Sequence, residues 1–283
     1  MSPLYKGLLW FIPGLIILLV ISFIIFDEDG KIDLKSIKSN IWKARGGFLI
    51  LFIVLGLLKL ENFIHNFHPS GFRITWWFYS LEGVGHIVWL QQTLDNYYVI
   101  HASSIFYILG LSYFVIFAPI FFLIRCEIHI FEQFCKALAV NYMFLLSGYF
   151  LLHVLVTSYY QPGEIQAFMY DIPQYNAIIL LTNRQSNCFP SGHISIPLTI
   201  TLIARYRTGL KKLQTMGFIF VIVTVFVIIY LGIHWLIDIP AGIAVAIFAY
   251  WSTSNGTFDT LFDKITKPFE KWTETFNNGY FNE

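Results

Sequence analysis

The chain has 283 residues, of which 57% are hydrophobic and only 12% are charged, against about 25% charged in an average soluble protein. So few charges cannot cover the surface of a soluble globule, and a net charge of +1 gives no reason to expect nucleic-acid binding. The odd number of cysteines and their wide spacing predict buried free thiols rather than a disulfide framework or a zinc site: Cys126, Cys135 and Cys188.

Seven apolar runs are candidates for membrane-spanning helices. A hydrocarbon core of roughly 30 Å needs roughly 20 apolar residues in a helix. The first run is long for a signal-peptide core and lacks a small-x-small cleavage site, so we interpret it as a retained span. The second and fifth are short or weakly bounded, which leaves six or seven spans. The runs are Leu8–Phe26, Gly47–Ile64, His101–Ile124, Phe134–Val156, Ser191–Ala204, Gln214–Leu231 and Leu236–Trp251.

The segments outside these runs complete an all-α, polytopic membrane bundle. Arg73 to Gln92 mixes tryptophans with polar side chains, which predicts an interfacial amphipathic helix; a re-entrant or packed loop is the alternative. The tail after Ser252 is hydrophilic and predicts a surface helix or a frayed end. The expected organisation is an N-terminal span with a basic loop (1–46), a transmembrane domain (47–252) and a hydrophilic tail (253–283).

The distribution of basic residues predicts the sidedness of the bundle. With seven spans, 14 Lys and Arg fall on one side and 4 on the other, namely Lys6, Lys59, Arg73 and Arg184. The positive-inside rule makes the richer side cytoplasmic. Loops 65–100, 157–190 and 232–235 are then extracytoplasmic or lumenal, and they hold most of the chemically competent side chains.

One candidate site motif is Cys188-Phe189-Pro190-Ser191-Gly192-His193, which precedes an apolar helix. Ser191 is suited to cap that helix, and Gly192 lets backbone N–H groups approach a ligand closely. A helix N-terminus with free N–H groups is an anion site that suits phosphate. His193, in the first turn, is placed to give a proton to a leaving oxygen. As an isolated tetrapeptide, Pro-Ser-Gly-His occurs often by chance.

A second motif, Gly232-Ile233-His234-Trp235-Leu236-Ile237-Asp238, also precedes an apolar run. His234 and Asp238 are four residues apart, a spacing that places them on one face of a helix. An Asp bound to one ring nitrogen fixes the tautomer and makes the other nitrogen a nucleophile or base. The alternative is a structural pair that braces two helices, although ionisable groups near a membrane are more often functional.

The two motifs are expected to meet at one membrane surface. His234 follows His193 by 41 residues, which is one span out, a basic loop and one span back. His193, His234 and Asp238 therefore converge on the outer face. Arg184, six residues before Pro190, is the cation of the adjoining loop that could clamp phosphate oxygens.

This combination resembles the type 2 phosphatidic acid phosphatase superfamily over roughly residues 100–251. The resemblance implies a six-helix phosphatase-type core and a metal-independent enzyme without a cofactor, acting on a lipid phosphate within the bilayer. It implies that His234 attacks phosphorus to form a phosphohistidine, that Asp238 orients it and that His193 is the general acid. Ser191, Gly192 and Arg184 would contact the substrate. It carries no expectation for nucleic acid or for the oligomeric state.

The sequence also departs from the family pattern. The usual Lys-x6-Arg-Pro motif is absent, with Gln161-Pro162 and Arg184 in that neighbourhood. Val227 and Ile228 stand where Ser-Arg normally precedes the histidine, and an apolar side chain cannot clamp phosphate. The branch with inositol phosphorylceramide synthases also lacks that arginine and is more similar. In that branch a lipid or polyol hydroxyl resolves the phosphohistidine. Lys59 and Arg73 are weaker substitutes for the clamp.

Other histidines are weaker candidates, and two other function classes stay open. His65, His68 and His86 share the outer side, but their irregular spacing does not favour zinc. His129 and His153 are expected to be structural. Glu82 is expected on a solvated helix face, with headgroup binding as the alternative. The chain could instead be a transporter or scramblase, although charged residues are nearly absent from the later spans, or a degenerate binding or assembly subunit.

Overall fold

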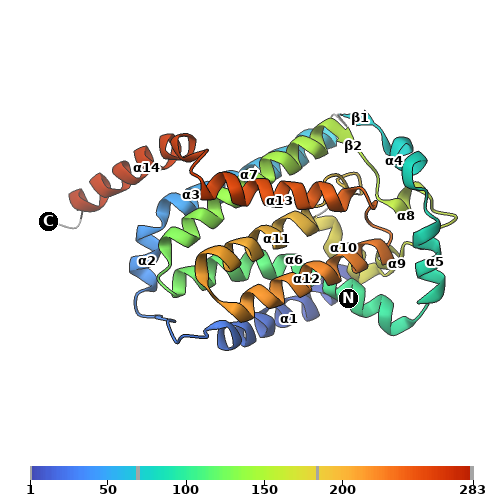
Figure 1. Ribbon diagram of the computed structural model, residues 1–283, viewed down its shortest axis with the longest axis horizontal. Coiled ribbons are helices and arrows are strands. Elements are labelled where there is room, and N and C mark those ends of the chain that lie inside the picture. Colours follow the sequence, from blue (N-terminus) through green and yellow to red (C-terminus); the bar gives the residue numbers. More distant parts are fainter. Residues whose placement is uncertain (1, 68–70, 183–184, 281–283) are drawn as a thin grey trace.

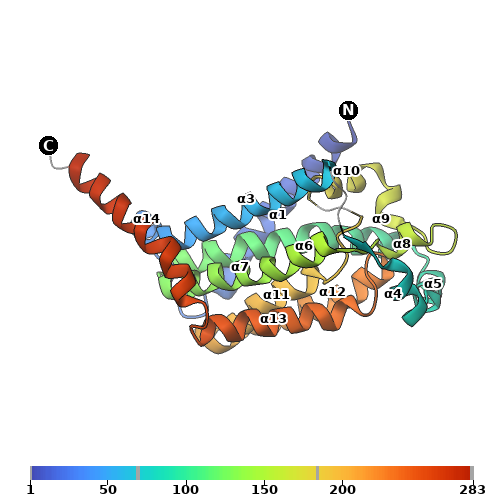
Figure 2. The same ribbon diagram turned by 90° about the horizontal axis from the view of Figure 1, so that it is seen from above.

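The computed structural model describes residues 2–67, 71–182 and 185–280, without the side chains of 65–67, 181–182 and 277–280. Long apolar runs form helices because a helix satisfies its own backbone hydrogen bonds where water is absent. These helices lie lengthwise beside one another (Figures 1 and 2). They are α1 (Pro3–Phe26), α3 (Arg45–Phe67), α6 (Tyr97–Ile124), α7 (Ile128–Leu151), α11 (Gly192–Ile203) with the π-helical η1 (Ala204–Thr208), α12 (Lys211–Tyr230) and α13 (Asp238–Ser254).

Short elements gather at the two ends of the bundle. One end carries most of them (Figure 1): β1 (Phe72–Arg73), α4 (Thr75–Glu82), α5 (Gly85–Thr93), β2 (Leu152–His153), α8 (Thr157–Tyr160), α9 (Phe168–Asp171) and α10 (Pro173–Thr182). At the other end lie α2 (Ile37–Lys43) and the start of α14 (Asp259–Tyr280), which projects away from the bundle (Figure 2). The two strands pair in parallel. The all-α fold class predicted from composition is confirmed.

Five of the described helices are long and apolar enough to cross a membrane: α1, α3 as far as Ile64, α6, α7 and α12. This makes the chain a multi-pass membrane protein. The other two expected spans also form helices within the bundle, but they are short. α13 has 17 residues, and α11 has 12 before its backbone changes to the π-helical turn η1.

Several expected boundaries were wrong. The predicted span Phe134–Val156 ends too late, because α7 ends at Leu151 and the next residues pair with β1 or lie extended. The single interfacial helix expected over 73–92 is two helices, α4 and α5. They are separated at Gly83, whose φ of +59° is a conformation that favours glycine. The tail is helical as far as Tyr280.

Most of the buried hydrophobic side chains form two clusters, and the largest fully buried members of these are aromatic. One, centred on α6 and α7, contains the fully buried Phe114, Phe117, Phe121 and Phe131. The other lies at the end with the short helices and contains Phe78, Trp235 and Tyr230. Helices α11 and α13 approach closely at Gly242, where an added Cβ would lie 2.8 Å from the carbonyl oxygen of Ser191. Glycine at this position therefore lets the two helices that begin beside the site pack together.

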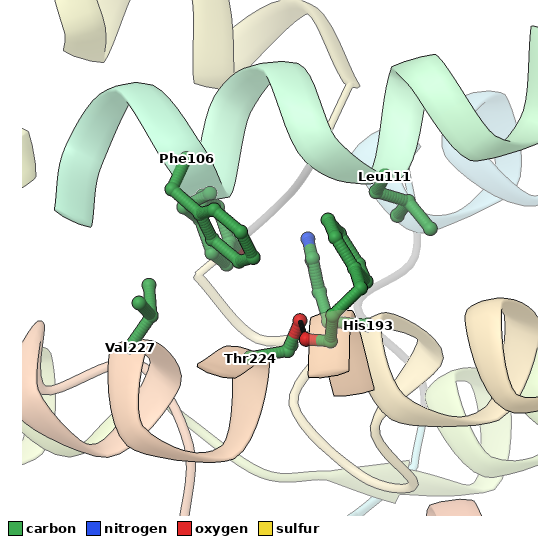
Figure 3. A pocket seen from close by; sticks show the side chains of 7 residues that line it. Phe106, Leu111, His193, Thr224 and Val227 are labelled. Atoms are coloured by element: carbon green, nitrogen blue, oxygen red, sulfur yellow. Dashed lines mark hydrogen bonds between the residues drawn. The ribbon is translucent and has the colours of Figure 1, made fainter. Parts of the chain in front are cut away.

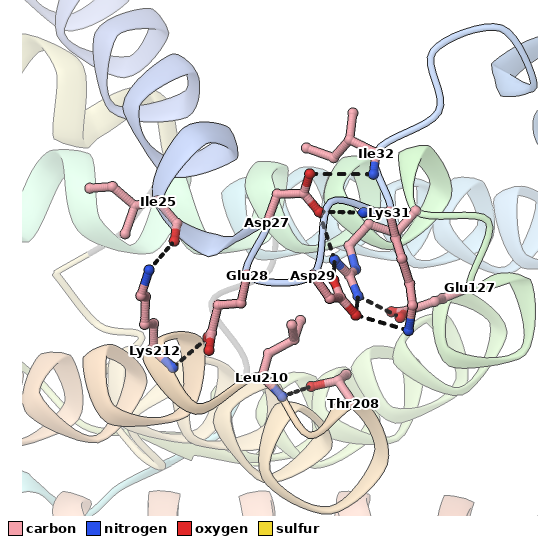
Figure 4. A network of polar contacts seen from close by, with 11 residues as sticks. Ile25, Asp27, Glu28, Asp29, Lys31, Ile32, Glu127, Thr208, Leu210 and Lys212 are labelled. Carbon is pink, nitrogen blue, oxygen red and sulfur yellow. Dashed lines mark hydrogen bonds and ion pairs between the residues drawn. The ribbon is translucent and has the colours of Figure 1, made fainter.

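A cluster of charges lies at the opposite end of the bundle, where α1 meets α6 and α7 (Figure 4). The Arg125 side chain is buried and donates hydrogen bonds to Asp27, Asp29 and Glu127 at 2.6 to 3.1 Å. The Arg125 guanidinium, followed by Lys31, holds the pKa of the Asp29 carboxyl well below its usual range. These ion pairs attach the loop after α1 to the α6–α7 turn.

Candidate active site

His234 and Asp238 form a buried hydrogen-bonded pair where α12 passes into α13. His234 Nδ1 lies 2.9 Å from Asp238 Oδ2, and the backbone N–H of Trp235 donates to the same oxygen at 2.9 Å. The two side chains are almost fully buried. The expected stacking on one helix face was wrong, because α13 begins at Asp238 and His234 lies in the preceding loop. The loop folds back so that the pair still forms.

Cys188 contacts this pair, a contact that the sequence did not predict. Its Sγ lies 3.0 Å from Asp238 Oδ2, 3.5 Å from His234 Nδ1 and 3.1 Å from the carbonyl oxygen of Ile233. Burial, followed by the charge of Asp238, raises the pKa of the Cys188 thiol well above its ordinary value. The thiol therefore stays protonated and donates to the carboxylate. A free buried thiol was expected, but its spacing from residue 238 gave no sign of this contact.

The same three side chains are the described group best placed to hold a metal ion. One ligand atom from each of Cys188, His234 and Asp238 lies within 4.8 Å of the others. Thiolate, imidazole and carboxylate are ligands that zinc accepts. Binding an ion there would require Cys188 to lose its proton and His234 Nδ1 to give up its hydrogen bond to Asp238.

The Pro190-Ser191-Gly192-His193 segment lies directly against His234. Ser191 precedes α11, but its side chain makes no cap; the Oγ lies 3.3 Å from His234 Nε2. The predicted capping role was therefore wrong, and the hydroxyl faces His234 Nε2 instead. The first helical hydrogen bond near here runs from Ser195 N to Ser191 O. The N–H groups of Gly192 and the next two residues thus precede the helical bonding, as an anion site requires.

His193 lies in the first turn of α11, as expected, and its ring lies between two aromatic rings and a pocket. Its ring lies 5.8 Å from the ring of His234, centroid to centroid, in an edge-to-face arrangement, and stacks on Tyr107 at 4.2 Å. It also lines a small, mainly apolar pocket between α6 and α12 (Figure 3). The other lining residues are Phe106, Tyr107, Leu111, Phe220, Thr224 and Val227.

Lys59 and Arg73, two of the basic residues proposed as a phosphate clamp, do not join the described site. Arg184 lies outside the described residues. Lys59 and Arg73 are exposed, and within the described ranges neither forms a hydrogen bond with the histidines or Asp238. Val227 and Ile228 are core residues, and the carbonyl oxygen of Ile228 accepts the His234 N–H at 3.2 Å. At this position the chain supports the histidine through its backbone.

The remaining histidines do not gather around a metal in the part of the chain that is described. His68 and the side chain of His65 lie outside it. His86 is partly buried, and burial lowers its pKa. His129 is exposed at the opposite end of the bundle, and His153 lies on β2, where burial and then Arg73 lower its pKa.

Residues 78–252 match a family model described as the PAP2 superfamily, which is more than half of the chain. No curated protein and no solved structure matches the chain significantly. The matched segment contains His193, His234 and Asp238 as well as α6, α7 and α12. Members of this superfamily are generally phosphatases or phosphotransferases. With five helices able to span a bilayer, the chain belongs to the PAP2 superfamily as a multi-pass membrane protein.

Proposed function

We propose that this protein is a phosphatase or phosphotransferase that acts on a lipid-linked phosphate with His234 as its nucleophile. The observation that carries the proposal is the buried His234–Asp238 pair, at 2.9 Å, within a chain of this superfamily. A carboxylate on Nδ1 keeps the proton there, which leaves a lone pair on Nε2. That nitrogen faces Ser191 and the first turn of α11.

In the first step His234 Nε2 forms a bond to phosphorus while the bond from phosphorus to the leaving oxygen breaks. His193 gives its proton to that oxygen, and Asp238 stabilises the charge on the His234 ring. In the second step an oxygen of water, or of an acceptor hydroxyl, bonds to phosphorus and the P–N bond breaks. The proton of that water or hydroxyl passes to His193, which restores the starting state.

Two further observations support a lipid-phosphate substrate. The N–H groups at the start of α11 suit an anion. Helices α6 and α12, which lie beside His193, are long and apolar enough to span a membrane, so the site lies next to the bilayer. We place the site on the extracytoplasmic or lumenal side, from the distribution of basic residues.

The test is phosphate release from a panel of lipid phosphates by detergent-purified protein in excess EDTA. The control variant is His129→Ala, which removes an exposed histidine far from the site. We expect His234→Ala to abolish release and His129→Ala to retain it. Substantial turnover by folded His234→Ala would contradict the nucleophile.

The same assay with an added polyol or lipid alcohol separates a hydrolase from a transferase. A new phosphorylated or headgroup-exchanged product would identify a transferase that acts like the inositol phosphorylceramide synthases. If folded wild-type protein neither releases nor transfers phosphate from any substrate, the enzyme proposal fails. A lipid-flip assay in vesicles then tests the transporter or scramblase alternative.

A further inference from the structure

Glu82, at the C-terminal end of α4, binds the backbone of the loop that carries His234. Its Oε1 accepts the N–H of Leu236 at 2.7 Å, and its Oε2 accepts the N–H of Ile237 at 3.1 Å. These two N–H groups directly precede α13, so they have no acceptor within that helix. A carboxylate is the favoured partner for such donors, because it is charged and lies at the positive end of the helix.

Helix α4 also packs against the segment that precedes His193. The ring of Phe78, which is buried, lies 5.3 Å from Phe189 and 6.2 Å from Trp235, measured between ring centroids. Phe189 precedes Pro190-Ser191-Gly192-His193, and Trp235 follows His234. Helix α4 therefore packs on the chain next to both histidines.

The N-terminal end of α4 is fixed to the body of the protein. Thr75 Oγ1 accepts the N–H of Leu155 at 3.0 Å and donates to the carbonyl oxygen of His153. The Trp235 indole N–H donates to the carbonyl oxygen of Leu155 at 2.9 Å. Both ends of α4 thus connect to the His234 loop, directly through Glu82 and indirectly through Leu155.

The electrostatic setting of Glu82 is that of a structural acceptor rather than a solvated surface charge. The side chain is half-buried, and burial raises the pKa of its carboxyl. The two backbone N–H groups lower this pKa again, and the nearby charge of Asp238 raises it. The expectation of a solvated helix face was therefore wrong.

We propose that Glu82 is a positioning residue, which holds the loop after His234 so that the His234 ring stays aligned with Asp238 and with the phosphate. The inference deepens the proposed function and rests on it. Glu82 contacts the loop backbone rather than the catalytic side chains, so it acts on the rate of the chemical step and not on substrate affinity. A misplacement of the nucleophile by about 1 Å is enough to slow a reaction by about 100-fold.

The test compares Glu82→Gln and Glu82→Asp with a matched control, Glu164→Gln. Gln keeps the size but offers only one acceptor, and Asp keeps the charge but is shorter by one methylene. Glu164 is exposed in a loop at the same end of the bundle. In Glu82→Gln we expect kcat to fall by about 10- to 100-fold with KM within twofold, because the ring is misplaced. Glu82→Asp should lie between this variant and wild type, and the control should match wild type.

Hydrogen–deuterium exchange over residues 233–237 tests the Glu82 hydrogen bonds to the loop without any substrate. We expect faster exchange at Leu236 and Ile237 in Glu82→Gln, and no change in the control. If Glu82→Gln does not fold, Glu82→Asp carries both measurements. Unchanged exchange, or a raised KM with unchanged kcat, would overturn the positioning role. If Glu82→Gln exchanges faster but the wild-type protein has no phosphate activity, the Glu82 contact with the loop is supported and the proposed enzyme is rejected.

Discussion

At the scale of single residues, His193 has contacts that separate its proposed role from that of His234. Its ring lines the apolar pocket and lies edge-to-face against His234, without a hydrogen bond to Asp238 in the described structure. A residue in this place can give a proton to the leaving oxygen but cannot be activated as His234 is. The two roles therefore predict different effects of the leaving group on kcat.

We expect His193→Ala to lower kcat by about 10²- to 10⁴-fold on a lipid phosphate, because its alkoxide needs a proton to depart. An activated aryl phosphate needs no such proton, so the loss on it should be far smaller. The measurement is kcat for both substrates with wild type and variant. Thr224→Val, which changes the wall of the same pocket, should affect the two substrates alike. Equal losses in His193→Ala would argue against the acid role.

The three residues singled out by the sequence lie together, whereas two of their partners were not predicted. The spacing of His193, His234 and Asp238 across two apolar runs was enough to place them at one end of the bundle. Cys188 and Glu82 join them through contacts that span 50 and 154 residues along the chain. No local pattern encodes such a contact, because it depends on how α4 and the 185–190 loop fold over the bundle.

At the scale of elements, the junction of α1 with the α6–α7 turn depends on one buried cation. The Arg125 side chain has no exposed surface, and its partners Asp27, Asp29 and Glu127 are only partly exposed. We expect Arg125→Met to lower the free energy of unfolding by about 3 kcal/mol, since it removes one member of a largely buried ion cluster. Thermal unfolding in detergent measures this loss.

The control for this prediction is Lys267→Met, which breaks the exposed Lys267–Asp263 pair on α14 and should change little. The pH dependence gives a second check. The folded pKa of Asp29 is lowered, so its pairing stabilises the protein above the ordinary carboxylate pKa of 3.8 and is lost as pH falls below that value. An Arg125→Met variant as stable as the control would contradict the role of the cluster.

Helix positions were predictable, but several helix ends were not. Hydrophobicity alone located the cores of α1, α3, α6 and α12, since a bilayer demands long apolar runs. The apolar run over 134–156 gives no sign that α7 ends at Leu151, because four of the five residues over 152–156 are apolar. Strand pairing with Phe72 and Arg73 sets that boundary, and the local sequence does not predict this pairing.

At the scale of the whole molecule, the asymmetric distribution of basic residues makes a testable statement about sidedness. The end that bears the short helices and His234 should face away from the cytoplasm. In a background with Cys126→Ser, whose natural thiol is exposed, we expect Glu164→Cys to react with a membrane-impermeant maleimide in intact cells. Lys211→Cys, at the opposite end, should react only after the cells are opened. The reverse pattern would invert the orientation.

The Glu82 contact also bears on when the site comes into existence during synthesis. Its partner Leu236 follows 154 residues later, and Asp238 comes later still. A nascent chain inserted as far as α12 already contains its first apolar helices and Glu82. It has neither His234 nor the loop backbone that Glu82 binds. Under the proposed function, the chain must be extended through His234 and Asp238 at the start of α13 before it can attack a phosphate. A chain that stops at the end of α12 should therefore have no phosphate-transfer activity.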